Sequence, residues 1–217
     1  MDETSAALGR LGLIPVVKID NAAWALQLAN ALMEGGLPCA EITFRTSAAE
    51  DSIRRIAAAD PRLIIGAGTV LTVDQAERAV AAGAKYIVSP GFDPGLVDWC
   101  LAHEIPVIPG IATPTEIQMA LARGIELVKF FPAEALGGVG MLKAISAAFS
   151  RVSFVPTGGI TSENLASYAG LPMVLACGGS WVVAEKLLSD GAFGEISRLA
   201  REATEIVAHA RAKGGLS

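Results

Sequence analysis

A single lysine stands within a short apolar run of the chain. Lys129 lies between Val128 and Phe130, in a stretch whose residues predict a buried strand. A lysine withheld from water loses part of the solvation that favours its ammonium form, and a neutral amine attacks carbonyl carbons. The run therefore indicates a nucleophilic lysine. The alternative is a strand-end lysine whose stem packs on apolar neighbours while its head reaches water.

Polar and apolar residues alternate at positions 41–45. Glu41, Thr43 and Arg45 are separated by single apolar residues. Because successive side chains of a strand point to opposite faces, these three polar groups share one face. A buried carboxylate needs a partner, which Arg45 or the ammonium of Lys129 could supply. A structural ion pair between Glu41 and Arg45 is the alternative to a role in chemistry.

The elements that must position these residues follow one repeated pattern, in which a short apolar run and a polar or glycine-bearing turn precede an alanine-rich amphipathic helix. The predicted strands are nearly continuously apolar, as strands buried on both faces of a parallel sheet are. They cover residues 14–19, 39–44, 63–70, 86–90, 106–112, 127–132, 154–159 and 173–179. Helices are predicted at 22–34, 48–59, 73–82, 95–103, 115–122, 139–149, 163–169, 181–188 and 193–212.

Eight such units predict an α/β fold, a single (β/α)₈ TIM barrel with an extra N-terminal helix. We expect one domain over residues 1–217, with the N-terminal helix at 1–12 and a C-terminal helix and tail at 191–217. An open doubly wound sheet is the alternative. It would require a nucleotide-binding fingerprint, and the glycines at 66 and 68 lack the third glycine of that motif.

A barrel carries its active site at the carboxyl ends of its strands, and three of these ends are rich in glycine. Gly158 and Gly159 end the seventh strand, and residues 178–180 end the eighth. Backbone N–H groups at such turns, followed by helix starts, bind phosphate. The third strand ends in Gly-Ala-Gly before Thr69, where a ligand could approach the backbone and a hydroxyl is available. Ordinary tight turns would also explain these glycines.

Composition limits the classes of partner. The 217 residues carry a net charge of -5 with no cluster of Lys or Arg, which argues against nucleic acid and anionic membranes. Hydrophobic residues make up 52%, which favours an oligomer. The acidic start and the lack of an apolar run of ~20 residues predict a soluble, cytoplasmic protein. Three widely spaced cysteines indicate neither a disulfide framework nor a thiolate metal site.

The two histidines argue against metal and triad chemistry. His103 falls on a predicted helix and His209 near the C-terminus, so neither lies at a strand end. A zinc-dependent mechanism therefore lacks its ligands, and no histidine is placed to activate a serine or cysteine. We expect no metal and no cofactor.

Seven motifs, taken in chain order, resemble those of the 2-keto-3-deoxy-6-phosphogluconate (KDPG) and 4-hydroxy-2-oxoglutarate (KHG) aldolase family. The resemblance runs from about residue 14 to about residue 207, and Lys-Phe-Phe-Pro-Ala-Glu is highly specific for the family. The motifs are EITFRT at 41–46, GAGTV at 66–70, SPG at 89–91, PGIATP at 109–114, VKFFPAE at 128–134, PTGGI at 156–160 and GGSW at 178–181.

The resemblance implies a metal-independent class I aldolase that splits KDPG into pyruvate and glyceraldehyde 3-phosphate, a step of the Entner–Doudoroff pathway. It also implies a homotrimer. The implied roles are the Schiff-base lysine for Lys129, the acid/base for Glu41, carboxylate binding for Arg45 and Thr69, phosphate binding for Gly158, Gly159, Gly179 and Ser180, and pocket lining for Phe131, Thr157 and Pro90.

The chemistry explains these residue types. Breaking the C3–C4 bond leaves electrons on C3, and a protonated imine on Lys129 accepts them. Dehydration of the carbinolamine and loss of the C4 hydroxyl proton both require proton transfer, for which Glu41 is placed. Such help contributes typically ~10²–10⁴-fold in rate.

Substrate preference stays open at this point. Lys18 departs from many members and either borders the substrate carboxylate or is a solvated strand-end lysine. The substrate could be KDPG, its galactonate-derived epimer, or KHG as well. Two other classes remain: a phosphosugar isomerase or epimerase on the same barrel, which has no obvious need for Lys129, and a non-catalytic phosphate-binding protein.

Overall fold

The protein is an α/β fold built on parallel strands, described here from a computed structural model over residues 2–215. Every strand pair is parallel, as the apolar strand pattern predicted. The strands are β1 (Leu13–Val17), β2 (Cys39–Thr43), β3 (Ile64–Gly68), β4 (Ile87–Val88), β5 (Val107–Ile108), β6 (Gly110–Ile111), β7 (Leu127–Phe130), β8 (Ser153–Pro156) and β9 (Cys177–Gly179).

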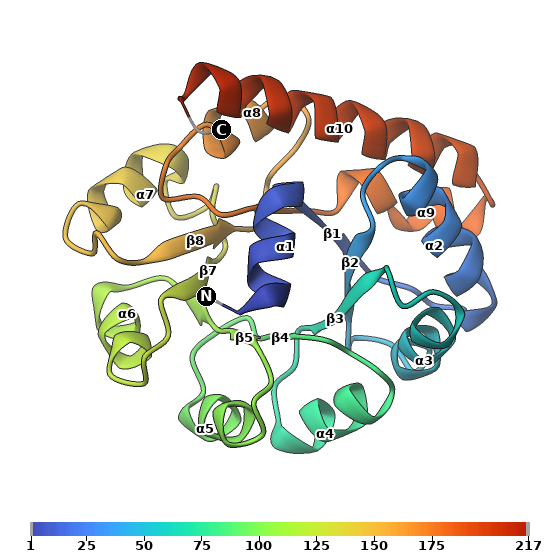
Figure 1. Ribbon diagram of the computed structural model, residues 1–217, viewed down its shortest axis with the longest axis horizontal. Coiled ribbons are helices and arrows are strands. Elements are labelled where there is room, and N and C mark those ends of the chain that lie inside the picture. Colours follow the sequence, from blue (N-terminus) through green and yellow to red (C-terminus); the bar gives the residue numbers. More distant parts are fainter. Residues whose placement is uncertain (1, 216–217) are drawn as a thin grey trace.

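The strands form two parallel sheets. The larger sheet has the order β5-β4-β3-β2-β1-β9 and curves as half of a barrel, while β6, β7 and β8 form the smaller sheet (Figure 1). The predicted strand at 106–112 is divided at Pro109, so that its halves belong to different sheets. Single bridges from Phe154 to Val174 and from Thr157 to Gly178 connect the smaller sheet to the larger one. The order differs from that of the doubly wound alternative.

The helices that follow the strands lie outside them in Figure 1, as the βα pattern predicts. Helix boundaries agree with the predicted ranges within two or three residues, except that residues 22–24 and 181–183 form the 3₁₀ helices η1 (Ala22–Trp24) and η2 (Trp181–Val183). The predicted strand at 173–179 is shorter than expected, because β9 begins at Cys177. The α-helices are α2 (Ala25–Glu34), α3 (Ala49–Ala59), α4 (Val73–Ala81), α5 (Pro94–Ala102), α6 (Pro114–Leu121), α7 (Gly138–Ser146), α8 (Leu165–Ala169), α9 (Glu185–Ser189) and α10 (Phe193–Lys213).

Side chains cap the N-termini of several helices, where the loops that follow the strands end. Thr72 and Asp93 accept hydrogen bonds from the first turns of α4 and α5. Thr113 and Glu116 form a reciprocal capping box at the start of α6. Because each cap satisfies backbone donors that the helix leaves free, the loop before it is held in one geometry.

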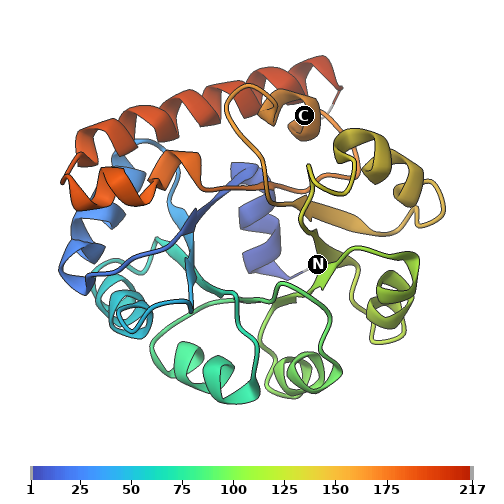
Figure 2. The ribbon, with the colours of Figure 1, turned by 180° about the vertical axis from the view of Figure 1, so that it is seen from behind.

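The first helix lies near the centre of the two sheets rather than on their outer side. Helix α1 (Glu3–Leu11) is capped by Asp2, whose carboxylate accepts the backbone N–H of Ser5 at 2.8 Å. Both views show it over the centre of the strands (Figures 1 and 2). It lies within the predicted 1–12 segment, of which Met1 falls outside the described residues, as do positions 216 and 217 of the predicted tail.

The last helix is tied to the start of the chain. Arg211 on α10 donates hydrogen bonds to the carbonyls of Gly9 and Leu175, each at 2.7 Å. These carbonyls belong to α1 and to the segment before β9. One guanidinium therefore connects three parts of the fold.

The interior is apolar with one charged exception. Cys39, Cys100 and Cys177 are free thiols and are buried in the interior. Across residues 2–215, Glu41 and Lys129 are the charged residues that are buried. Within the same residues no helix combines the length and the apolar character needed to cross a membrane.

Candidate active site

Glu41 and Lys129 meet inside the fold. Nζ of Lys129 lies 3.1 Å from Oε1 of Glu41, and the residues are 5% and 2% exposed. Glu41 is on β2 and Lys129 on β7, strands of different sheets. The alternation at 41–45 therefore predicted the correct face for Glu41. The alternative pair with Arg45 is wrong, because Lys129 takes the carboxylate and Arg45 is exposed at the strand end.

Glycine in β3 makes room for the carboxylate. Gly68 is paired in register with Thr43, and a Cβ atom at Gly68 would overlap the carboxylate of Glu41. Likewise a Cβ at Gly66 would overlap the ring of Tyr86. These glycines were predicted to let a ligand approach the backbone. In the structure the space beside them is instead filled by side chains of the protein itself.

The amine of Lys129 lies beside an aromatic ring. Nζ is 5.4 Å from the centroid of Phe131, two residues along the chain on the same face. Phe131 in turn lines the cavity described below. The amine is thus adjacent to a cavity although it is nearly covered.

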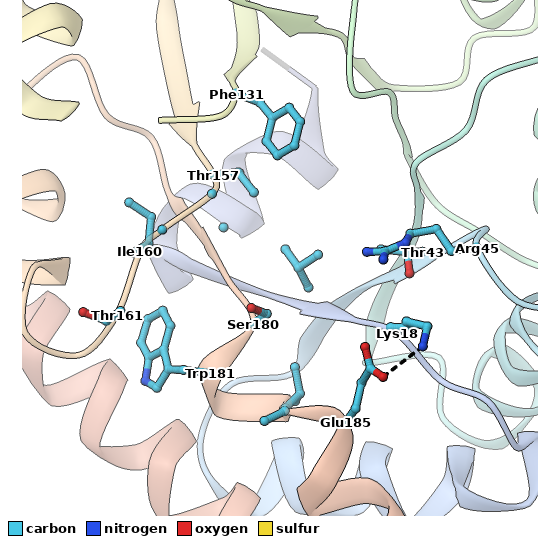
Figure 3. Close-up of a pocket in the computed structure, with 16 residues that line it drawn as sticks. Lys18, Thr43, Arg45, Phe131, Thr157, Ile160, Thr161, Ser180, Trp181 and Glu185 are labelled. Atoms are coloured by element: carbon cyan, nitrogen blue, oxygen red, sulfur yellow. Dashed lines mark hydrogen bonds and ion pairs between the residues drawn. The ribbon is translucent and has the colours of Figure 1, made fainter. Parts of the chain in front are cut away.

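A cavity of about 570 Å³ opens at the carboxyl ends of the strands (Figure 3). Its polar side chains come from the ends of β1 and β2 and from the segments after β8 and β9, as a site at one edge of parallel strands requires. It is lined by Val16, Lys18, Thr43, Arg45, Phe131, Thr157, Gly158, Gly159, Ile160, Thr161, Gly178, Ser180, Trp181, Val183, Ala184 and Glu185. Six of the predicted site residues are among them.

The turn after β8 has a backbone that only glycine adopts readily. Gly158 and Gly159 have φ values of 97° and 81°. The carbonyl of Gly158 accepts the N–H of Glu134 at 3.1 Å, and the carbonyl of Gly159 accepts the side-chain amide of Asn164 at 3.0 Å. With its carbonyls held in this way, the turn lines the cavity in a fixed geometry.

The two glycines of the second pair, Gly178 and Gly179, differ in their position relative to the cavity. A Cβ at Gly178 would overlap the hydroxyl of Thr157, and one at Gly179 would overlap the ring of Trp181. Gly178 lines the cavity, whereas Gly179 is buried behind Trp181. The exposed Ser180 follows them at the cavity edge.

Four predicted residues, besides Gly179, do not line the cavity. Lys129 and Glu41 are buried next to it, as described above. Thr69 is a half-buried residue with a φ of 55°, a conformation that non-glycine residues rarely hold and that is found at ligand sites. Pro90 is also half-buried, and its carbonyl lies where a Cβ at Gly110 would be.

Comparison with known proteins identifies the family. The family model described as "Aldolase: KDPG and KHG aldolase" matches residues 5–199. The chain belongs to this family. It is 50% identical over 201 residues to a 2-dehydro-3-deoxy-phosphogluconate aldolase of Treponema pallidum, covering 93% of this chain and 96% of that one.

Two solved structures are similar over nearly the whole chain. The KDPG aldolase of Legionella pneumophila, with pyruvate captured as a covalent carbinolamine, is 40% identical with a TM-score of 0.90 and covers 93% of this chain and 98% of its own. The Zymomonas mobilis KDPG aldolase with 3-phosphoglycerate is 36% identical with a TM-score of 0.85, covering 92% and 94%.

Within this KDPG and KHG aldolase fold, sequence reasoning missed part of the cavity. Trp181 has no role among the predicted site residues, yet it is half-buried and lines the cavity. Lys18 lines the cavity and stays partly exposed to water, as the solvated alternative predicted: its Nζ lies 2.9 Å from Glu185, and hydrogen bonding to Glu185 raises the pKa of Lys18. These partners are 167 residues apart, so no local pattern could join them.

A hydrogen bond between two side chains also supports the turn after β8. The hydroxyl of Tyr168 on α8 donates to Glu134, the last residue of the Lys-Phe-Phe-Pro-Ala-Glu run. Burial, followed by this hydrogen bond, raises the pKa of Tyr168. A Cβ at Gly159 would lie 2.6 Å from that of Glu134, so this side chain packs directly against the glycine turn.

The charges and donors suit a ketone that carries anionic groups. In residues 2–215 no three His, Cys, Asp or Glu side chains are grouped to hold a metal ion. What the site offers is an amine hydrogen-bonded to a carboxylate, a guanidinium at the rim and a glycine turn opposite it. These groups can form an imine, move a proton and bind two anions.

Proposed function

We propose that the protein is a class I aldolase that cleaves KDPG to pyruvate and glyceraldehyde 3-phosphate through a Schiff base on Lys129. The observation that carries the proposal is the buried contact between Nζ of Lys129 and Oε1 of Glu41 at 3.1 Å beside the cavity. A buried charged pair costs free energy through desolvation, so it is poor evidence for a stabilising role. The family and the relatives with pyruvate and phosphoglycerate support a catalytic one.

In the first stage the amine of Lys129 attacks C2 of the substrate. The ammonium transfers a proton to Glu41, within hydrogen-bonding distance, and the free amine adds to the ketone. Glu41 then returns the proton to the departing hydroxyl, and water leaves as the protonated imine forms. One carboxylate serves as base and then as acid.

In the second stage the imine accepts the electrons of the C3–C4 bond. The C4 hydroxyl loses its proton to Glu41, directly or through a water molecule, and glyceraldehyde 3-phosphate leaves. The remaining enamine takes up a proton at C3, and hydrolysis of the imine releases pyruvate and restores Lys129. Proton transfer of this kind contributes typically ~10²–10⁴-fold.

The remaining residues bind the two anionic ends. We assign the C1 carboxylate to Arg45 and Thr69, and the phosphate to Gly158, Gly159, Gly179 and Ser180. Phe131, Thr157 and Pro90 complete the pocket around the reacting carbons. Arg45 offers a planar fork suited to a carboxylate, and binding at the distant phosphate orients the bond that breaks.

The test is borohydride reduction in the presence of pyruvate, followed by peptide mass spectrometry. We expect one pyruvyl adduct, on Lys129, and none after Lys129→Ala. Lys143→Ala, an exposed lysine on α7, is the matched control and should keep the adduct. No adduct, or an adduct on another lysine, would contradict the proposal and favour an isomerase or epimerase, which has no need of an imine.

Rates on a panel of 2-keto-3-deoxy acids decide the substrate preference. KHG is included because the family description names it, and the galactonate-derived epimer because it differs from KDPG at one carbon. Pyruvate is the expected product from all three. The panel ranks them by kcat/KM.

We also propose a closed barrel for the fold, a location in the cell and an oligomeric state. Together β5 and β6 act as one strand, and the two sheets with their bridges make one closed eight-stranded TIM barrel with an N-terminal helix, a single domain over residues 1–217. The bridge between Thr157 and Gly178 supports this closure. We further propose a cytoplasmic homotrimer, which light scattering after size-exclusion chromatography tests.

A further inference from the structure

A charged pair lines the same cavity without a place in the proposed chemistry. Nζ of Lys18, directly after β1, donates to Oε2 of Glu185 at 2.9 Å (Figure 3). Glu185 is the first residue of α9, and both side chains line the cavity. Their side chains are 29% and 56% exposed, so both charged heads remain open to a ligand.

The strand order places this pair between the two proposed anion sites. Strand β1 lies between β2 and β9 in the larger sheet. Arg45 follows β2 and Ser180 follows β9, so Lys18 ends the strand between the carboxylate site and part of the phosphate site. A substrate that reaches both sites must pass the end of β1 with its middle carbons.

The pair suits a hydroxyl better than an anion. An ammonium has three N–H donors, and Lys18 directs one to Glu185 and a longer contact, 3.4 Å, to Asp20. A hydroxyl can accept from Lys18 while it donates to Glu185, because it is both donor and acceptor. A carboxylate only accepts, so it would be repelled by Glu185 and would compete with it for Lys18.

The two candidate substrates of this family differ at the carbon concerned. KDPG carries a hydroxyl at C5 and its phosphate at C6, whereas KHG carries a carboxylate at C5. We propose that Lys18 and Glu185 are specificity-determining residues that contact C5, and that Glu185, held by Lys18, favours the phosphorylated sugar acid over KHG. This inference rests on the proposed aldolase function and extends it to residues outside the family motifs.

The experiment measures kcat/KM for both substrates on each variant, so that a partly unfolded preparation cancels in the ratio. Glu185→Gln keeps the shape and removes the negative charge. We expect it to lower the KDPG-to-KHG ratio by about tenfold or more, through weaker KDPG binding and less repulsion of KHG. Lys18→Met leaves Glu185 unpaired and should move the ratio the other way, because the loss is larger for KHG.

Asp190→Asn is the matched control. Asp190 pairs with Lys186 at 2.8 Å beside the same helix but does not line the cavity, so the ratio should stay within twofold of the wild-type value. Pyruvate has no C5, so the adduct with borohydride should form normally in all three variants.

The outcomes separate this inference from the proposed function. Normal pyruvate trapping with an unchanged ratio in Glu185→Gln overturns the specificity role and leaves the aldolase intact. A ratio that moves equally in Asp190→Asn, or in the same direction in both pocket variants, also overturns it. Absence of trapping in the wild-type protein overturns both proposals.

Discussion

At the scale of single residues, Glu41 can lie against Lys129 because Gly68 has no side chain. The carboxylate occupies the space where a Cβ atom of Gly68 would stand. Gly68 makes no contact with substrate in the proposed mechanism, yet it decides where the proton acceptor lies. A glycine of the strand is thus a positioning residue for the buried pair.

This arrangement predicts that Gly68→Ala impairs catalysis. The new methyl group displaces the carboxylate from Lys129, so we expect kcat to fall by about 10²-fold or more. Gly140→Ala, in the exposed part of α7 where nothing lies within 4 Å, is the control and should keep full activity. Its unfolding free energy should rise by up to ~1 kcal/mol, as expected for Ala over Gly in a helix. Wild-type kcat in Gly68→Ala would contradict the positioning role.

The phosphate assignment predicts a selective effect of Ser180→Ala. A hydrogen bond to a charged group contributes about 1.5–3 kcal/mol, so KM for KDPG should rise by roughly 10- to 100-fold with little change in kcat. KHG has no phosphate, and its kinetics should be unaffected. Ser189→Ala, on an exposed serine at the end of α9, is the control. Equal losses with both substrates would refute the assignment.

How much of the site can be predicted from the sequence depends on how far apart the contacting residues are along the chain. The alternation at 41–45 predicted the face of Glu41, and the glycine turn at 158–159 was placed correctly at the cavity. The pairing of Glu41 with Lys129 was left open, because 88 residues separate them and local patterns do not measure contacts. Glu185 and the cavity role of Trp181 were missed for the same reason. The glycines of β3 were misinterpreted, since their neighbours come from other strands.

At the scale of elements, Arg211 connects the long helix α10 to two distant parts of the chain. Arg211 donates to the carbonyls of Gly9 and Leu175 at 2.7 Å, which join α10 to α1 and to the segment before β9. In contrast, Arg198 pairs with Glu195 and Glu202 within the same helix, and these side chains are exposed. Exposed pairs contribute little to stability.

We therefore predict that Arg211→Met lowers the unfolding free energy by about 1–3 kcal/mol, because partly buried carbonyls lose their donors. Arg198→Met should cost about 0–1 kcal/mol. Urea denaturation of both variants measures the difference. Pyruvate trapping should be normal in each folded variant, since Arg211 lies outside the cavity lining. Equal stability of the two variants would contradict a stabilising role for the hydrogen bonds of Arg211.

Element boundaries were predicted well where caps are local. Thr72, Asp93 and Thr113 sit next to the helices they cap, so the sequence shows the signal directly. The division of the strand at 106–112 was not predicted, because it depends on which neighbours each half finds. Pro109 lies between the halves and cannot donate a backbone hydrogen bond.

At the scale of the whole molecule, the core holds three thiols that the folded state keeps protonated. Burial raises the pKa of Cys100 to about 11 and that of Cys177 to about 12, and it raises the pKa of Cys39 further. A thiolate is the reactive form, so these groups should be inert in the native protein.

The prediction has two parts. A thiol reagent at pH 8 should label none of the three cysteines in the native state and all three in denaturant. Because the folded pKa values exceed the ordinary value of 9.0, the folded state holds more protons at high pH. The unfolding free energy should therefore fall as pH rises from about 9 to about 11. Rapid native labelling, or stability that rises over this range, would contradict it.

The pairing of β1 with β9 has a consequence for synthesis on the ribosome. Strand β1 is made early, but one of its two neighbours is Cys177–Gly179, near the other end of the chain. Until that segment emerges, the nascent chain carries an unpaired apolar edge and lacks Ser180, Trp181 and Glu185 of the cavity. Unpaired edges invite wrong pairing between chains, so a stalled or shortened translation product should be both inactive and prone to aggregate.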